Sequence, residues 1–293
     1  MSIALLFPGQ GSQTVGMGRT LHEKSARAQK LFEEAEAVLG IPLRQYMFEG
    51  PPEMLRRTSI TQPALYVHGY AVAVERGIEP EAVAGHSLGE FTALAVAGVF
   101  DFIEGLQLVK VRAEAMQAAC DEKPSTMAAI IGLPNEVVER LCQETTEGLV
   151  VPANYNSPGQ LVVSGDIAAV EALIARAKAA GARLAKKLEV NGAFHSPLMA
   201  SAREKLAAAI AATPFRAPKY AIYPNVTARA TKDPQQLKEL LTEQLTAPVR
   251  WAQTLQNMWA DGIRTFYEMG PGNVLVGLVK RTLSEAQATA CDA

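Results

Sequence analysis

Residues 82–90 read AVAGHSLGE and join two kinds of local structure. The first residues of this stretch are small and apolar and fit a buried strand, and the segment from Leu88 onward fits a helix. Ser87 stands between them, with Gly85 and Gly89 on either side in the pattern G-x-S-x-G. A strand, a sharp turn and a helix in this order expose the serine hydroxyl at the edge of a parallel sheet. The stretch therefore predicts an α/β fold with a reactive serine.

The same alternation continues outside this stretch. Residues 3–7 form an apolar run that ends at Pro8, which is typical of a central parallel strand followed by a loop. Asp101 stands three residues before Glu104, and this spacing predicts a capping box on a helix that runs to about Cys120. Further helices are expected over 25–39 and 62–77, and further strands over 220–226 and 265–269. The last residues of the chain are expected to form a frayed tail.

The predicted order of strands and helices changes between residues 126 and 190. Strand, helix, strand, strand, helix and strand are expected in turn over 126–133, 135–146, 149–156, 160–165, 166–180 and 183–190. The order βαββαβ is that of a ferredoxin-like domain. We therefore expect a large α/β-hydrolase-like domain with a mostly parallel sheet, residues 1–123 and 192–293. A ferredoxin-like small domain, residues 124–191, is inserted in it.

The composition narrows the class of protein. Of the 293 residues 48% are hydrophobic, which is enough for a large domain with a smaller partner. The net charge of -2 gives no reason to expect nucleic-acid binding. No apolar run reaches the roughly 18 residues of a membrane span, so no membrane contact is expected. Three cysteines without a C-x-x-C pair and four scattered histidines predict no disulfide framework, no metal site and a cytoplasmic location.

A serine nucleophile needs a neighbouring base, and two histidines are candidates. His86 directly precedes Ser87, but on a tight turn its side chain should point elsewhere, so we expect it to pack and brace the turn. His195 stands in GAFHSP, residues 192–197, where the chain re-enters the large domain. A lone histidine is more often structural than catalytic, and the pattern alone leaves both roles of His195 open.

Arg112 falls on the buried face of its predicted helix. Polar side chains such as Gln107 and Glu114 share one face of a helix that turns by about 100° per residue. Arg112 lies opposite them, in line with Leu108 and Met116. A buried arginine is unfavourable unless it is paired. Two explanations stay open: an internal ion pair, or a guanidinium fork for the carboxylate of a substrate.

Other classes of protein fit these features less well. Gly9 and Gly11 follow a strand as in dinucleotide-binding enzymes, but Thr14 stands where that fingerprint needs a third glycine. A plain serine hydrolase explains Ser87 and His195 but not a buried cation. A scaffold without activity has no need of both Ser87 and His195.

Motifs along almost the whole chain resemble one family, the malonyl-CoA:acyl-carrier-protein transacylases, which includes the acyltransferase domains of polyketide synthases. The motifs are FPGQGSQ (residues 7–13), GHSLGE (85–90), NYNSPGQ (154–160), AFHSPLM (193–199) and GPG (270–272). Each motif alone is weak evidence for the family, but the order and spacing of all five together are specific to it.

The resemblance implies roles for the catalytic residues. Ser87 would be the nucleophile and His195 its general base. A backbone carbonyl, expected from Arg250, would orient the histidine in place of an acidic third member. The backbone N–H groups of Gln10 and Leu88 would form the oxyanion hole.

The resemblance also implies the substrates. Malonyl-CoA would donate the acyl group to the phosphopantetheine thiol of an acyl carrier protein, with no cofactor, and the chain would act as a monomer. Arg112 would hold the malonate carboxylate, and Met116, Phe194 and Asn156 would line the acyl site. The ring of Phe194 would fill the space of a 2-methyl branch, whereas Asn156 also fits an ordinary Asx turn. A stand-alone polyketide acyltransferase and a serine hydrolase of thioesters are the alternatives.

Overall fold

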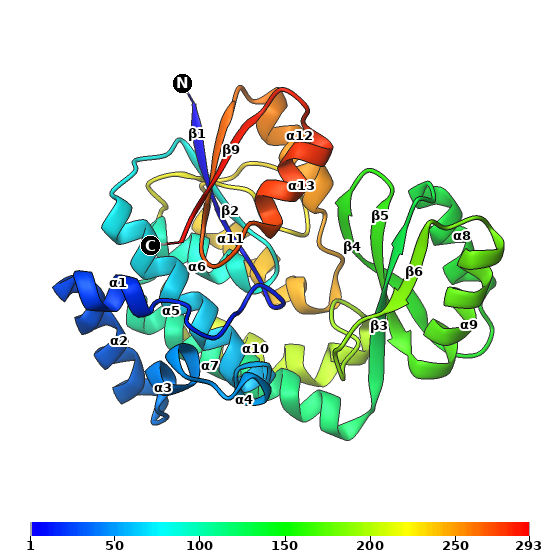
Figure 1. Cartoon of the computed structure of the whole chain (residues 1–293), viewed down its shortest axis with the longest axis horizontal. Helices are drawn as coiled ribbons and strands as arrows, with labels where there is room; N and C mark the ends of the chain where they lie inside the picture. The colour runs from blue at the N-terminus through cyan, green and yellow to red at the C-terminus, as the bar shows by residue number, and fades with distance from the viewer. Residues whose placement is uncertain (1, 293) are drawn as a thin grey trace.

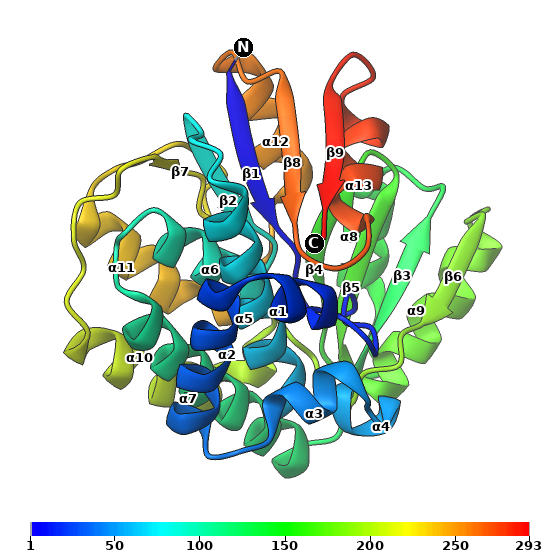
Figure 2. The ribbon, with the colours of Figure 1, turned by 60° about the vertical axis from the view of Figure 1, so that its left-hand side comes forward.

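The computed structural model describes residues 2–292, which form two separate sheets (Figure 1). The first sheet is parallel throughout, in the order β7-β2-β1-β8-β9, as Figure 2 shows. Its strands are β1 (Ile3–Phe7), β2 (Ala82–Gly85), β7 (Ala221–Ile222), β8 (Thr265–Met269) and β9 (Gln287–Cys291). The predicted central strand and the predicted strand before Ser87 are thus confirmed as neighbours in one parallel sheet.

Helices cover both faces of this sheet because alternate side chains of its strands point to opposite sides. Leu5 and Phe7 of β1 enter the core beneath α2 (Ala26–Leu39), α5 (Thr58–Arg76), α6 (Leu88–Val96) and α7 (Phe102–Glu122). Ala4 and Leu6 enter the opposite core, beneath α12 (Trp251–Ala260) and α13 (Val274–Thr282). The other helices are α1 (Arg19–Lys24), α3 (Leu43–Phe48), α4 (Pro52–Leu55), α10 (Ala200–Ala212) and α11 (Pro234–Glu243), with short 3-10 turns η1 (Pro197–Met199) and η2 (Gln244–Thr246).

The second sheet is antiparallel, in the order β4-β5-β3-β6. It consists of β3 (Ser125–Ile131), β4 (Val150–Ser157), β5 (Gln160–Asp166) and β6 (Leu184–Lys187), and it shares a core with α8 (Asn135–Glu144) and α9 (Ile167–Ala179). The predicted order of strands and helices in this segment is confirmed. Figure 1 shows the two helices on the side of the sheet that faces away from the rest of the molecule.

The helix that carries Arg112 begins as the sequence predicts. The Asp101 side chain accepts the Glu104 N–H at 2.8 Å, and the Glu104 side chain accepts the Asp101 N–H at 2.8 Å, which completes the capping box. The helix α7 then runs as far as Glu122. Among residues 2–292, no helix is both long and apolar enough to span a bilayer.

Several predicted boundaries are wrong, and the C-terminal tail most clearly so. Residues 287–291 are not frayed but form the edge strand β9, which pairs in parallel with β8 and buries Cys291. The segment is rich in alanine and threonine, and an edge strand held by backbone hydrogen bonds needs little apolar patterning. Elsewhere α5 begins at Thr58 rather than 62, and the strand expected over 220–226 is only Ala221–Ile222.

Candidate active site

Ser87 lies on a turn whose backbone conformation is rare for a residue with a side chain. It joins β2 to α6 with φ 53° and ψ −109°. A Cβ atom at Gly85 would overlap the Gly89 carbonyl, and one at Gly89 would overlap the Phe7 carbonyl of β1. The glycines of G-x-S-x-G are therefore a packing requirement of this strand–turn–helix, which places Ser87 at the edge of the parallel sheet.

The His195 imidazole lies between Ser87 and two backbone carbonyls. Its Nε2 is 2.7 Å from Ser87 Oγ, and its Nδ1 is 3.0 Å from the Gln244 oxygen and 3.1 Å from the Ala247 oxygen. Since carbonyls only accept, Nδ1 carries the hydrogen and Nε2 is left to accept the hydroxyl proton of Ser87. The arrangement suits a serine nucleophile paired with a histidine base.

The expectation that Arg250 supplies the orienting carbonyl is wrong. The Arg250 oxygen accepts the Thr254 N–H at 2.9 Å, because the residue caps the start of α12 and its carbonyl points into that helix. The carbonyls that face His195 come from Gln244 and Ala247, at the two ends of the short turn η2.

Burial keeps this histidine neutral. Only 3% of His195 is exposed, and burial, together with the nearby Arg112 cation, lowers its pKa to about 3. The two carbonyl contacts oppose this shift, because they favour a protonated ring. At neutral pH the imidazole is therefore free to take a proton, and the carbonyls stabilise the imidazolium that forms.

Two backbone amides beside Ser87 are free to donate. Leu88 is the first residue of α6, so its N–H has no partner within the helix. Within residues 2–292, neither its amide nor that of Gln10 donates a hydrogen bond. The Ser87 N–H, in contrast, donates to Asn225 Oδ1 at 2.8 Å. Of these three amides, Gln10 and Leu88 thus keep a free N–H, as the predicted oxyanion hole requires.

Arg112 reaches the nucleophile from α7 and is 1% exposed. Its Nη1 donates to Gln62 Oε1 at 2.7 Å, and its Nη2 donates to Ser87 Oγ at 3.0 Å and to Gln244 Oε1 at 3.2 Å. Burial lowers its pKa to about 10, although Glu90 opposes this shift, so the guanidinium stays charged. Among residues 2–292 it forms no direct ion pair with a carboxylate, and its hydrogen-bond partners are neutral acceptors.

Three polar side chains of the site were not expected from the sequence. Gln62 of α5 is fully buried and its Nε2 lies 3.1 Å from Met116 Sδ. The helical-face reasoning applied to Arg112 would have found it, since it too is a polar residue on a buried face. Asn225 and Gln244 lie outside the long helices and strands, and no local pattern marks them.

A cavity of about 100 Å³ gathers most of the expected residues. Its lining includes Gln10, Ser87, Leu88, Arg112, Met116, Phe194 and His195. Asn156 lies beside it instead, in a neighbouring cavity of about 450 Å³. There its Oδ1 accepts from His86 Nε2 at 2.8 Å, and the His86 ring also packs 5.4 Å from that of Trp251. His86 thus braces the turn, as predicted.

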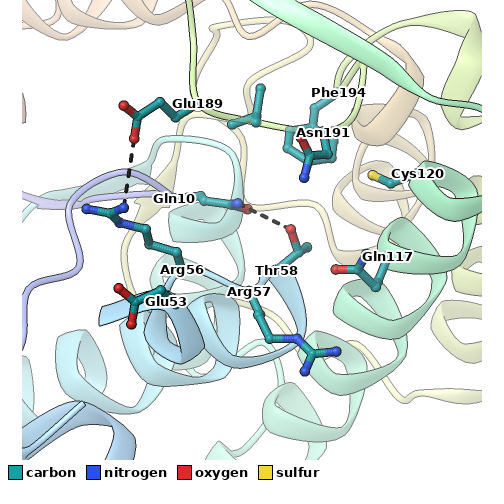
Figure 3. A pocket seen from close by; sticks show the side chains of 11 residues that line it. Gln10, Glu53, Arg56, Arg57, Thr58, Gln117, Cys120, Glu189, Asn191 and Phe194 are labelled. Carbon is teal, nitrogen blue, oxygen red and sulfur yellow. Dashed lines mark hydrogen bonds and ion pairs between the residues drawn. The ribbon is translucent and has the colours of Figure 1, made fainter. Parts of the chain in front are cut away.

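A larger cavity of about 490 Å³ opens beside the small one, and Figure 3 shows the side chains that line it. Gln10 and Phe194 line both cavities, so the space next to Ser87 borders the open one. Gln10 is held there by a hydrogen bond to Thr58 Oγ1 at 3.3 Å. Arg56 and Glu189 face each other across the cavity at 3.9 Å (Figure 3).

Comparisons with known proteins agree with this geometry. The family model described as "Acyl transferase domain" matches residues 4–292. The malonyl CoA-acyl carrier protein transacylase of Escherichia coli (strain K12) is 42% identical over 98% of this chain and 94% of that protein. The solved transacylase of Coxiella burnetii is 36% identical, with a TM-score of 0.96 over 100% of this chain and 94% of its own.

A second solved structure is the malonyl-transacylase in complex with a type II PKS acyl-carrier protein. It is 39% identical to this chain, with a TM-score of 0.96, and the match covers 100% of this chain and 96% of that one. The nucleophile turn, the histidine and the buried arginine thus occur in a chain that matches these proteins from end to end. The chain belongs to the acyl transferase domain family, among the malonyl-CoA:acyl-carrier-protein transacylases.

Proposed function

We propose that this protein moves malonyl from malonyl-CoA to the phosphopantetheine thiol of an acyl carrier protein, through a malonyl ester on Ser87. The observation that carries the proposal is the charge of Arg112. A fully buried cation lies 3.0 Å from the nucleophile, and within residues 2–292 its hydrogen-bond partners are all neutral. Burying a charge without an ion-pair partner is strongly unfavourable. The site therefore favours an acyl group that carries a negative charge.

The first half-reaction uses the pair Ser87 and His195. As Oγ attacks the thioester carbonyl, its proton passes to Nε2 of His195, and the amides of Gln10 and Leu88 receive the oxyanion. The tetrahedral intermediate collapses with loss of the coenzyme A thiolate, which takes the proton from His195. The carrier thiol then attacks the malonyl ester by the same steps in reverse, so the kinetics are ping-pong.

The acyl site fixes which group is transferred. Arg112 would bind the malonate carboxylate through two parallel N–H···O bonds, which its planar fork favours. Phe194 and Met116, which line the same cavity, would exclude branched or longer acyl groups. Asn156 is proposed to line the approach to the site from the neighbouring cavity. A plain hydrolase of thioesters has no use for the buried arginine.

The relatives support the donor and the acceptor. The E. coli protein is named for malonyl-CoA and acyl carrier protein, and one solved neighbour is bound to a polyketide carrier. Both kinds of carrier present a phosphopantetheine thiol, so the same chemistry serves fatty-acid synthesis or a stand-alone polyketide acyltransferase. No cofactor is needed in the proposed reaction, because the coenzyme A thioester is already activated.

We also propose the division into domains that the sequence predicts. Residues 1–123 and 192–293 would form the α/β-hydrolase-like domain, and residues 124–191 the small one. The strand order β4-β5-β3-β6 with α8 and α9 supports the ferredoxin-like description of the latter. The monomeric state and the cytoplasmic location stay predictions, the second from three unpaired cysteines.

Intact-mass spectrometry tests the covalent step. After mixing with malonyl-CoA and no acceptor, the protein should gain one malonyl group, and adding a carrier thiol should remove it. Ser87→Ala should stay unmodified. An unmodified wild-type mass, or a label that persists in Ser87→Ala, would contradict the mechanism.

A further inference from the structure

Glu90 is a buried carboxylate that the proposed mechanism does not use. It lies in the first turn of α6, three residues after the nucleophile, and is 1% exposed. Its Oε2 accepts two hydrogen bonds, one from the Asn225 N–H at 3.0 Å and one from Gln244 Nε2 at 2.8 Å. One carboxylate oxygen therefore connects helix α6, which follows Ser87, to two segments that are distant in the sequence.

One of these segments holds the backbone of the nucleophile turn. The Asn225 side chain accepts the Ser87 N–H at 2.8 Å and donates to the Gly85 carbonyl at 2.7 Å. It thereby bridges the turn on both sides of His86. Because Ser87 has a rare backbone conformation, such a bridge restrains the turn in the form that faces His195.

The other segment connects Glu90 to Arg112. The Gln244 Nε2 donates to Glu90 Oε2 at 2.8 Å and to the Ser87 carbonyl at 2.9 Å, and its Oε1 accepts from Arg112 Nη2 at 3.2 Å. With acceptors on its nitrogen side and a donor on its oxygen side, the amide has only one favourable orientation. The opposite orientation would place an NH₂ group against the guanidinium.

We infer that Glu90 is a positioning residue for substrate choice: through the Gln244 amide it aims the Arg112 guanidinium at the acyl carboxylate. The inference rests on the proposed function, since it assigns Glu90 a part in recognising a charged acyl group. Glu90 touches neither the acyl group nor the thiol. Glu90 acts on Arg112 through the side-chain amide of Gln244, so the arrangement requires an acceptor oxygen at the position of Glu90 Oε2.

Glu90 can accept both hydrogen bonds in either protonation state. Burial raises the pKa of Glu90 to about 7, whereas the bonds from Gln244 and Asn225 and the nearby Arg112 cation oppose the shift. A neutral carboxyl group keeps one oxygen that accepts both bonds. Glu90→Gln imitates that neutral form, whereas Glu90→Leu removes the acceptor at a similar volume.

The test measures the ratio of kcat/KM for malonyl-CoA to kcat/KM for acetyl-CoA. Glu90→Leu should lower this ratio at least about fivefold, because the carboxylate loses a well-aimed charged partner. Glu90→Gln should stay within about twofold of wild type, since the acceptor is kept. Equal loss with both substrates in Glu90→Leu, or an unchanged ratio, would overturn the inference. A Glu90→Gln ratio as low as that of Glu90→Leu would also overturn it, since charge would then matter and not the acceptor.

Two further variants control the experiment. Glu268 of β8 is an equally buried carboxylate that accepts the Val276 N–H at 2.9 Å, so Glu268→Leu should lower stability without changing the ratio. Gln244→Met removes the relaying amide but leaves the backbone carbonyl that faces His195. It should lower the ratio at least as much as Glu90→Leu, because Gln244 contacts Arg112 directly. An unchanged ratio in Gln244→Met would overturn the inference even if Glu90→Leu does not fold. A wild-type enzyme without malonyl preference would refute the proposed function instead, which the variants do not test.

Discussion

Replacing Arg112 by alanine separates a malonyl transferase from a general thioesterase. The guanidinium is already oriented in the free protein, with Nη1 on Gln62 and Nη2 on Ser87 and Gln244. Each hydrogen bond to a charged group contributes about 1.5–3 kcal/mol net. Loss of two such bonds to the malonate carboxylate raises the barrier by at least about 3 kcal/mol, which corresponds to about two orders of magnitude in kcat/KM.

The same substitution has a second effect that the assay must separate. Arg112 also donates to Ser87 Oγ, so its loss changes the nucleophile for every substrate. Acetyl-CoA lacks the carboxylate and reports this shared part alone. The malonyl-to-acetyl ratio of kcat/KM should therefore fall by about two orders of magnitude in Arg112→Ala. Arg112→Lys should recover only part of it, because an ammonium cannot form the planar pair.

A matched control uses an arginine with a purely structural partner. Arg216 forms an ion pair with Glu104 at 2.7 Å on the surface, and Arg216→Ala should leave both rates unchanged. Thermal unfolding of each variant shows whether it is folded under the assay conditions. If Arg112→Ala lowers kcat/KM for both substrates by the same factor, the arginine does not bind the malonate carboxylate. The proposal that malonyl is the transferred group then loses its physical basis.

Two other outcomes are expected. Phe194→Ala should raise kcat/KM for methylmalonyl-CoA relative to malonyl-CoA about tenfold, since space for one methyl group is worth about 1–3 kcal/mol. Competition between the two thioesters measures this ratio. An unchanged ratio would show that the ring of Phe194 does not exclude a 2-methyl branch. The pKa of His195, held at about 3, keeps the base neutral in mild acid, so kcat/KM for malonyl-CoA should show no loss as the pH falls from 7.5 to about 5.5. An acid limb near pH 6.5 that persists in Glu90→Gln would mean that His195 titrates like a solvated histidine.

The catalytic residues were predictable where a local pattern reveals them. Ser87 is marked by its flanking glycines, and Arg112 by its place on a buried helical face. The carbonyls that orient His195 were not predictable, because a backbone oxygen has no side-chain signature, and Arg250 was wrongly expected to supply one. Asn225 and Ser87 are 138 residues apart in the sequence, so no local pattern predicts their contact.

The order of strands and helices around the antiparallel sheet was predictable for the same reason, and the C-terminal edge of the parallel sheet was not. The antiparallel sheet comes from one continuous segment with clear alternation of strands and helices. The strand β9 carries alanine and threonine in place of a hydrophobic pattern, so only its pairing with β8 reveals it. Such tertiary context overrides local preference, especially at sheet edges.

The way the strands of the parallel sheet are scattered along the chain sets an order of assembly during synthesis. The antiparallel sheet closes on itself within residues 125–187, so it can fold as soon as that stretch has left the ribosome. The strand β1 is made long before β8 (Thr265–Met269), one of its two neighbours in the sheet. The segments that grip the serine turn, at Asn225 and Gln244, also arrive late. The nascent chain therefore acquires its reactive serine only after the segments at Asn225 and Gln244 have been made.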